Sequence, residues 1–106
     1  MQIDGFDWDI GNLAKCQKHG VSLAEIEALL RVSDEFSPDI RHSIYEQRFV
    51  AIGKNSGGRS IFVGFALRER DGSVLLRPIS ARYMHLREAK RHGRQKAAAG
   101  SADDNR

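Results

Sequence analysis

Cysteine and long apolar runs are scarce in this chain of 106 residues. The single cysteine, Cys16, permits no internal disulfide and gives no support for a zinc site. No stretch of about 18 apolar residues is present, so the sequence predicts no membrane-spanning helix. The opening Met1-Gln2-Ile3-Asp4 lacks the basic start and apolar centre of a secretory signal. We therefore expect a cytoplasmic protein without disulfides.

Motifs for the common cofactors and reaction types are also missing. The sequence contains no P-loop, no dinucleotide-binding fingerprint, no metal-ligand spacing and no Ser-His-Asp order. We therefore predict no cofactor and no bound metal. The hydrophobic fraction of 41% is ordinary for a globular protein, and the length fits one domain. Spacing alone predicts a small globular domain and does not identify an enzyme.

The charge that is present is distributed unevenly along the chain. Residues 1–40 carry three basic and eight acidic side chains, a net charge of −5. Residues 41–81 and residues 82–106 each carry seven basic and three acidic side chains, a net charge of +4 per segment. An acidic first part and a basic remainder indicate either two kinds of partner, one of them polyanionic, or a mixed solvated surface.

Three helices are predicted from capping signals and apolar spacing. Asp9 is a suitable N-cap for a helix that runs to about residue 19. Ser22-Leu23-Ala24-Glu25 matches a capping box, which predicts a second helix to about residue 30. The third helix is expected to start near residue 85 and to end at Gly93.

Between the second and third helices the pattern is that of strands. Two turn signals, Asn55-Ser56-Gly57-Gly58 and Asp71-Gly72, join three predicted antiparallel strands over residues 48–52, 60–67 and 73–79. Residues 3–8 fit either a short strand or an extended lead-in, and the segment 31–45, which contains Pro38, fits a loop with at most one short edge strand. The expected fold is α+β: an antiparallel sheet of three to four strands with two N-terminal helices and one C-terminal helix. We expect one domain over residues 1–93 and a flexible tail over 94–106.

The last predicted strand carries an arginine among apolar neighbours. Side-chain alternation in residues 73–79 places Arg77 on a sheet face between Leu75 and Ile79, and Pro78 indicates a free edge or a bulge. A partly buried guanidinium needs an acceptor. That acceptor is either a carboxylate, such as Glu46, or a bound phosphate.

The chain becomes strongly basic after this strand. Arg82 and Tyr83 are expected where the strand ends, and Tyr83 either completes the edge of the core or stacks on an RNA base. The basic residues of the last helix form either a solvated face or a surface that attracts phosphate: Arg87, Lys90, Arg91 and Arg94. His42, in a loop, can serve as a general acid or base.

Five short motifs and Glu88 occur in order along residues 6–92. The motifs are Phe6-Asp7-Trp8-Asp9, Lys18-His19-Gly20-Val21-Ser22, Arg41-His42-Ser43, Glu46-Gln47-Arg48-Phe49-Val50-Ala51-Ile52-Gly53 and Arg77-Pro78-Ile79-Ser80-Ala81-Arg82. Each is weak alone, but the ordered set resembles the BrnT family of toxins from bacterial type II toxin–antitoxin systems. One departure is His85, where the family often has threonine or serine, and it adds a histidine close to the expected site.

The resemblance implies a RelE-like fold and a metal-independent ribonuclease that arrests translation by cutting RNA. It also implies a BrnA-like ribbon-helix-helix antitoxin in a heterotetramer with two copies of each chain, which binds operator DNA through the antitoxin. Two alternatives remain open: a non-catalytic nucleic-acid-binding module, and an inactive toxin relative or interaction protein that acts only through a partner.

A ribonuclease of the implied type uses the RNA's own 2′-hydroxyl as the nucleophile, with a base, an acid and cations for the charge on phosphorus. Under this reading, the candidates for proton transfer are His19, His42 and Glu46, and the candidates for stabilising phosphate are Arg77 and Arg82. The expected RNA-binding residues are Lys18, Arg48, Tyr83, Arg87 and Arg91.

Overall fold

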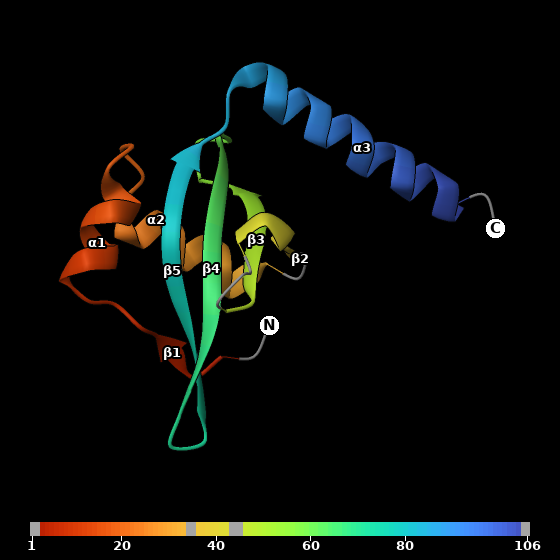
Figure 1. The fold of residues 1–106 in the computed structure, drawn as a ribbon. Coiled ribbons are helices and arrows are strands. Elements are labelled where there is room, and N and C mark those ends of the chain that lie inside the picture. Colours follow the sequence, from red (N-terminus) through yellow and green to blue (C-terminus); the bar gives the residue numbers. More distant parts are fainter. Residues whose placement is uncertain (1–2, 34–35, 43–45, 105–106) are drawn as a thin grey trace.

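The computed structural model describes residues 3–33, 36–42 and 46–104 of the chain (Figure 1). Along the sequence, the elements are β1 (Gly5–Phe6), α1 (Ile10–Gln17), α2 (Leu23–Val32), β2 (Phe36–Pro38), a short 3-10 helix η1 (Ile40–His42), β3 (Arg48–Lys54), β4 (Ser60–Arg70), β5 (Ser73–Tyr83) and α3 (Leu86–Asp104). The fold class is α+β, as predicted.

Helices α1 and α2 both begin with the predicted capping residues. The side chain of Asp9 accepts a hydrogen bond from the Asn12 N–H at 2.9 Å, and the Asn12 side chain accepts one from the Asp9 N–H at 2.7 Å. Ser22 and Glu25 form the same reciprocal pair at the start of α2. These bonds satisfy backbone N–H groups that a helix leaves without partners in its first turn.

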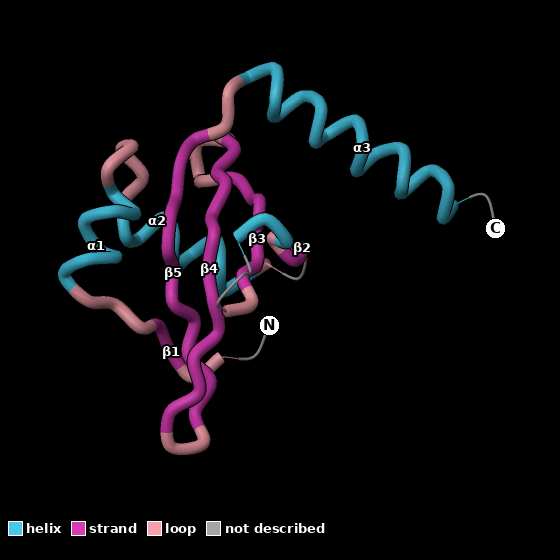
Figure 2. Tube along the Cα trace, viewed as in Figure 1, coloured by secondary structure: helices cyan, strands magenta, loops and turns pink. Residues whose placement is uncertain are grey.

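The sheet has five strands in the order β1-β5-β4-β3-β2, one or two more than predicted (Figure 2). The three long strands are antiparallel and joined by the two predicted hairpin turns. The additional strands are short: β2 pairs antiparallel with β3, and β1 pairs parallel with β5 at Leu75 and Leu76. The predicted antiparallel sheet is therefore correct except for the parallel pair at its β1 edge.

Strand β5 is longer than predicted and contains a bulge. Its pairing with β4 places Ser80 opposite Gly64 but Pro78 opposite Phe65, which leaves one extra residue in β5. This confirms the bulge that Pro78 indicated. The prediction that the strand ends at residue 79 was wrong, because β4 is long enough to pair with residues up to Tyr83.

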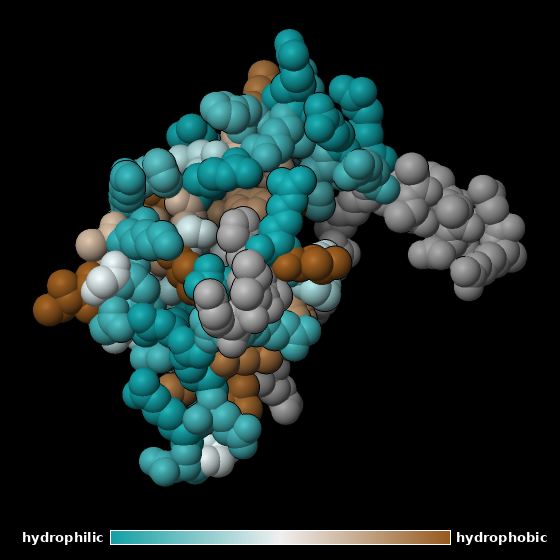
Figure 3. Space-filling model, viewed as in Figure 1, coloured by the Kyte–Doolittle hydropathy of each residue, from teal (hydrophilic) through white to brown (hydrophobic). Residues whose placement is uncertain are grey.

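The core lies between the sheet and the first two helices. In Figure 1, α2 crosses behind the sheet, and α1 lies beside β5. The buried side chains come from both layers: Cys16, Val21, Ile26, Leu29, Leu30, Ala51, Ile61, Val63, Phe65, Leu76 and Ala81. The face turned toward the viewer carries mostly hydrophilic side chains where residues are described (Figure 3).

Helix α3 projects away from the sheet and helices (Figure 1). The prediction that it ends at Gly93 was wrong, because the helix continues to Asp104. A single glycine inside a helix costs only about 1 kcal/mol, and the alanines at 97–99 are the strongest helix formers. The boundary between a domain over 1–93 and a flexible tail over 94–106 stays a prediction. No helix within the described ranges is long and apolar enough to cross a membrane.

Candidate functional site

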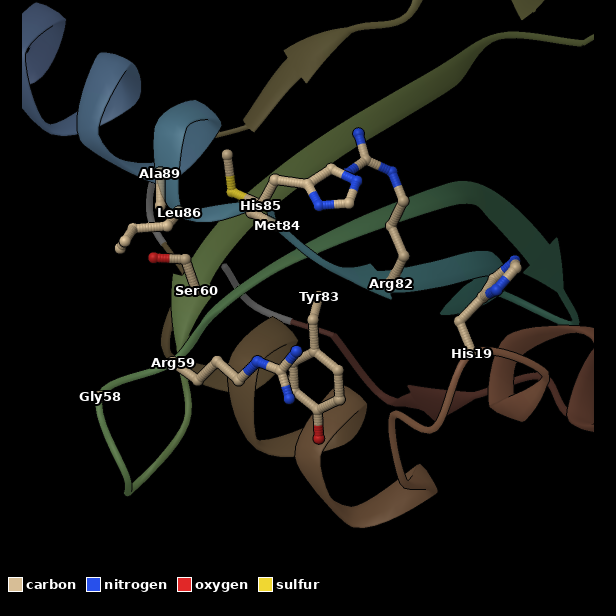
Figure 4. Close-up of a pocket in the computed structure, with 10 residues that line it drawn as sticks. All are labelled: His19, Gly58, Arg59, Ser60, Arg82, Tyr83, Met84, His85, Leu86 and Ala89. Atoms are coloured by element: carbon tan, nitrogen blue, oxygen red, sulfur yellow. The ribbon is translucent and has the colours of Figure 1, made fainter.

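A pocket of about 660 Å³ lies at the end of β5, where three connections meet (Figure 4). The loop between α1 and α2 contributes His19, the β3–β4 turn and the first residue of β4 contribute Gly58, Arg59 and Ser60, and the segment from β5 into α3 contributes the rest. The lining residues are His19, Gly58, Arg59, Ser60, Arg82, Tyr83, Met84, His85, Leu86 and Ala89. The fold therefore brings three predicted site residues, His19, Arg82 and Tyr83, to one place.

Arg82 is held by a carboxylate of α3. Its Nη1 and Nη2 donate to Glu88 Oε1 and Oε2 at 2.8 and 3.0 Å, and its guanidinium carbon lies 4.6 Å from the centroid of the Phe62 ring. The hydrogen bonds from Arg82 lower the pKa of Glu88 to about 2. Arg82 is thus a fixed cation in the pocket, and one side of its guanidinium already has an anionic partner.

Tyr83 leaves β5 on the side opposite Arg82 and points toward the helices (Figure 4). Its hydroxyl donates to the Glu25 carboxylate at 2.9 and 3.1 Å, which raises the pKa of the tyrosine. Hydrogen bonds from Asn55, the Ser22 backbone and Tyr83 lower the pKa of Glu25 to about 2. The phenol therefore stays protonated at neutral pH, and its ring is fixed at the wall of the pocket.

The pocket also contains an arginine and a histidine that are not among the predicted site residues. Arg59 was not singled out by the sequence, and its guanidinium carbon lies 3.8 Å from the centroid of the Tyr83 ring. His85 is exposed and lines the same pocket, as expected from its departure from the family pattern. The Asn55-Ser56-Gly57-Gly58 turn was the available signal for Arg59, because it places Arg59 just before β4, whose Ile61 pairs with Tyr83 of β5.

A second, smaller pocket of about 350 Å³ lies on the sheet and shares Arg82 with the first. It is lined by Lys15, Asp39, Arg48, Phe49, Phe62, Gly64, Phe65, Ile79, Ser80 and Arg82. Of the predicted site residues, Arg48 and Arg82 meet here. The bulge in β5 contributes Ile79 and Ser80 to this pocket, so it shapes the surface next to Arg82.

Arg77 lines neither pocket and pairs with two acidic residues near the start of α1. Its Nη2 lies 2.7 Å from Asp9 Oδ2, and its Nη1 lies 3.5 Å from Asp7 Oδ2. The ion-pair alternative from the sequence is therefore confirmed, with Asp9 and Asp7 in place of Glu46. A role for Arg77 in phosphate binding stays a prediction.

The remaining predicted residues are spread over the surface. Glu46 pairs with Arg68 and lies 3.9 Å from Arg48, and His42 ends η1 with its side chain outside the described residues. Lys18 is exposed at the C-cap of α1. Arg87 and Arg91 are exposed on α3. Glu46, Lys18, Arg87 and Arg91 do not line the pocket at the end of β5.

The chemistry available in the pocket is that of two imidazoles, two guanidiniums and a phenol. Guanidinium groups bind phosphate oxygens and carry no removable proton at neutral pH, whereas imidazole both accepts and donates protons. Within residues 3–33, 36–42 and 46–104, no group of three or more histidine, cysteine or acidic side chains is placed to hold a metal ion. The arrangement suits a phosphodiester whose proton transfers are made by side chains.

Comparison with protein families identifies the chain's relatives. A family model described as "Ribonuclease toxin, BrnT, of type II toxin-antitoxin system" matches residues 8–88, most of the chain. The matched range includes His19, Arg59, Arg82, Tyr83 and His85. No curated protein matches the sequence.

Proposed function

The chain belongs to the BrnT family, ribonuclease toxins of type II toxin–antitoxin systems, and we propose that it is an endoribonuclease that arrests translation. The pocket at the end of β5 is the proposed active site. The observation that carries this proposal is the meeting of His19, Arg82 and Tyr83 with His85 in one pocket. These groups come from two segments far apart in the sequence, yet together they supply a cation and proton carriers.

In the proposed reaction, the RNA's 2′-hydroxyl oxygen attacks the adjacent phosphorus. A bond from 2′-oxygen to phosphorus forms, the bond from phosphorus to the 5′-oxygen breaks, and the products are a 2′,3′-cyclic phosphate and a free 5′-hydroxyl. One imidazole, from His19 or His85, takes the 2′ proton, and the other protonates the departing oxygen. Arg82 stabilises the added negative charge on the phosphate oxygens. The nucleophile is part of the substrate, so this route needs no metal ion.

The other predicted residues have supporting roles in this proposal. Arg48, in the neighbouring pocket, binds a phosphate adjacent to the one held by Arg82. Lys18, Arg87 and Arg91 attract the RNA backbone from exposed positions. His42 and Glu46 remain alternative bases, although Glu46 is paired with Arg68.

A type II toxin pairs with an antitoxin. We propose that the antitoxin is a BrnA-like ribbon-helix-helix protein, in a complex of two toxins and two antitoxins that contacts operator DNA only through the antitoxin. The three long antiparallel strands with two helices behind them agree with the proposed RelE-like fold.

The proposal is tested with purified chain and single-stranded RNA labelled at one end. Wild-type protein is expected to produce fragments ending in 2′,3′-cyclic phosphate, with the same rate in excess EDTA. The Arg82→Ala variant should cut about 100-fold more slowly, which is typical for removal of one group that stabilises the transition state. His19→Ala and His85→Ala should each reduce the rate and remove one limb of its pH profile.

Arg70→Ala is the matched control, because Arg70 lies at the other end of β4 and lines neither pocket. Equal rates for Arg82→Ala and Arg70→Ala would place the active site elsewhere. RNA that stays intact but bound to folded wild-type protein would support the non-catalytic alternative. Metal-dependent cleavage would contradict the proposed mechanism.

A further inference from the structure

Arg59 occupies an unusual position among the pocket's cations. It is exposed, and Figure 4 shows its side chain reaching from the β3–β4 turn across the Tyr83 ring, 3.8 Å from ring centroid to guanidinium carbon. Arg77 and Arg82 each pair with a carboxylate. Among the residues that the structure describes, Arg59 has no carboxylate partner, and its guanidinium stacks on the ring of Tyr83.

The turn that carries Arg59 is fixed by its own hydrogen bonds. The Asn55 N–H donates to the Arg59 carbonyl at 3.0 Å, and the Arg59 N–H donates to the Asn55 side-chain oxygen at 2.9 Å. Gly58 has a φ of +80°, which favours glycine at this point of the turn. The backbone of Arg59 is thus held in one place before any ligand arrives.

The same network fixes the aromatic ring beneath the guanidinium. The Asn55 side-chain nitrogen donates a hydrogen bond to Glu25 Oε2 at 3.0 Å, and the Glu25 carboxylate also accepts a hydrogen bond from the Tyr83 hydroxyl. A Cβ atom on Gly20 would lie 3.9 Å from the edge of the ring, so the loop after α1 packs closely on Tyr83. One carboxylate, Glu25, therefore links the turn bearing Arg59 to the ring on which Arg59 lies.

We propose that Arg59, supported by Tyr83, is a nucleobase-binding subsite: an unpaired RNA base stacks on the guanidinium face that points away from the ring. Planar guanidiniums stack on bases, and single-stranded RNA is commonly recognised through such stacking. The subsite rests on the proposed function, because it takes the polyanion at this pocket to be RNA. It assigns base contact to Arg59 and phosphate contact to Arg82.

Stacking of an arginine on an aromatic ring is by itself no sign of function, since Arg31 lies over Phe6 at 4.9 Å. The difference is location. Arg31 lines neither pocket near Arg82, whereas Arg59 and Arg82 line the same one. Arg31→Ala is therefore a matched control, an exposed arginine stacked on an aromatic ring away from the proposed RNA path.

The test measures binding of a short 2′-O-methyl oligonucleotide, which the proposed reaction cannot cut. Arg59→Ala and Arg59→Lys are compared with wild type on the intact oligonucleotide and on a series in which each base in turn is removed. Arg59→Lys retains the positive charge but lacks the planar guanidinium on which a base can stack. Cleavage of ordinary RNA by wild-type protein is measured separately, so that loss of catalysis and loss of the subsite are distinguished.

Both Arg59 variants should bind about tenfold more weakly, equivalent to about 1.4 kcal/mol, while Arg31→Ala binds like wild type. At one position in the oligonucleotide, removal of the base should weaken its binding to wild-type protein by a similar factor and leave its binding to Arg59→Ala unchanged. This result would show that the base and Arg59 contact each other. If Arg59→Lys binds the oligonucleotide as tightly as wild type, Arg59 contacts phosphate, and the subsite is overturned. The subsite is also overturned if the effects of base removal and of Arg59→Ala on affinity are additive at every position, or if wild-type protein does not bind the oligonucleotide at low salt.

Discussion

Asn12 is the one described polar residue that is buried, and it joins α1 to β5. Its side chain is 6% exposed, its amide nitrogen donates to the carbonyls of Asp7 and Pro78 at 3.0 and 2.8 Å, and its oxygen accepts the Asp9 N–H. All of its bonding groups are used, as burial of an amide requires. The contact also fixes Pro78, which precedes the bulge in β5.

Asn12→Asp should destabilise the protein by roughly 1–3 kcal/mol, the usual penalty for leaving buried polar groups without partners. The aspartate keeps the acceptor for Asp9 but offers no donor to the Asp7 and Pro78 carbonyls. Urea unfolding measures the loss. Gln17→Glu is the matched control, because Gln17 makes its one recorded bond, to the Leu13 carbonyl, at an exposed position. Equal unfolding midpoints for the two variants would contradict this account of Asn12.

Two glycines show how packing decides the effect of one added methyl group on an element. A Cβ atom at Gly53 in β3 would lie 2.9 Å from Cγ of the buried Leu29 in α2, whereas one at Gly93 in α3 would meet nothing within 4 Å. Gly53→Ala should therefore cost roughly 1–3 kcal/mol in stability, since Leu29 cannot withdraw without disturbing the core.

Gly93→Ala should stabilise its helix, whereas Gly53→Ala destabilises the protein. It favours α3 by about 1 kcal/mol through helix propensity alone. Because α3 projects from the body, circular dichroism should show more helix with little change in the melting temperature of the domain. A lower melting temperature in Gly93→Ala, or an unchanged one in Gly53→Ala, would contradict the packing shown by the structure.

Elements that depend on neighbours in the chain were predicted well from the sequence. Asp9 as an N-cap and the Ser22–Glu25 capping box located the start of α1 and α2, because a cap contacts a residue only three positions away; the Asn12 half of the α1 box was not predicted. The end of β5 depends instead on β4, whose length sets how far pairing continues. Strand β1 is two residues long and is defined only by its distant partner.

Only the parts of the site that are set by residues near one another in the sequence could be predicted. Arg82 and Tyr83 stand out beside each other in the sequence, and His19 follows a recognisable helix end. The contact between Arg59 and Tyr83 was not predictable, because it joins a hairpin turn to the end of another strand. The separation of Arg77 from Arg82 was equally hidden, because it depends on the pairing of β5 with β4, which places Arg77 opposite Ala66 and Arg82 opposite Phe62.

At the scale of the whole molecule, the acidic first part and the basic remainder of the chain meet within one domain. Asp7 and Asp9 pair with Arg77, and Glu25 accepts bonds from Asn55 and Tyr83. Acidic side chains of the first part therefore join the start of α1 to the sheet through an arginine, and α2 to the sheet through neutral donors. Exposed cations outside these contacts, among them Lys18, Arg59 and the basic residues of α3, are available to a polyanionic partner.

Glu25 makes this arrangement sensitive to acid. Its pKa is about 2 in the folded protein against 4.5 for a free glutamate, so below pH 4.5 the unfolded chain binds a proton that the folded chain resists. The stabilisation by the Glu25 carboxylate is present above pH 4.5 and is lost as the pH falls toward 2. Glu25→Gln should melt at a lower temperature than wild type at pH 7, and thermal melts should show this difference shrinking steadily between pH 4.5 and 2. Melting temperatures that fall in parallel over that range would mean that the carboxylate at Glu25 does not hold the β3–β4 turn and Tyr83 against α2.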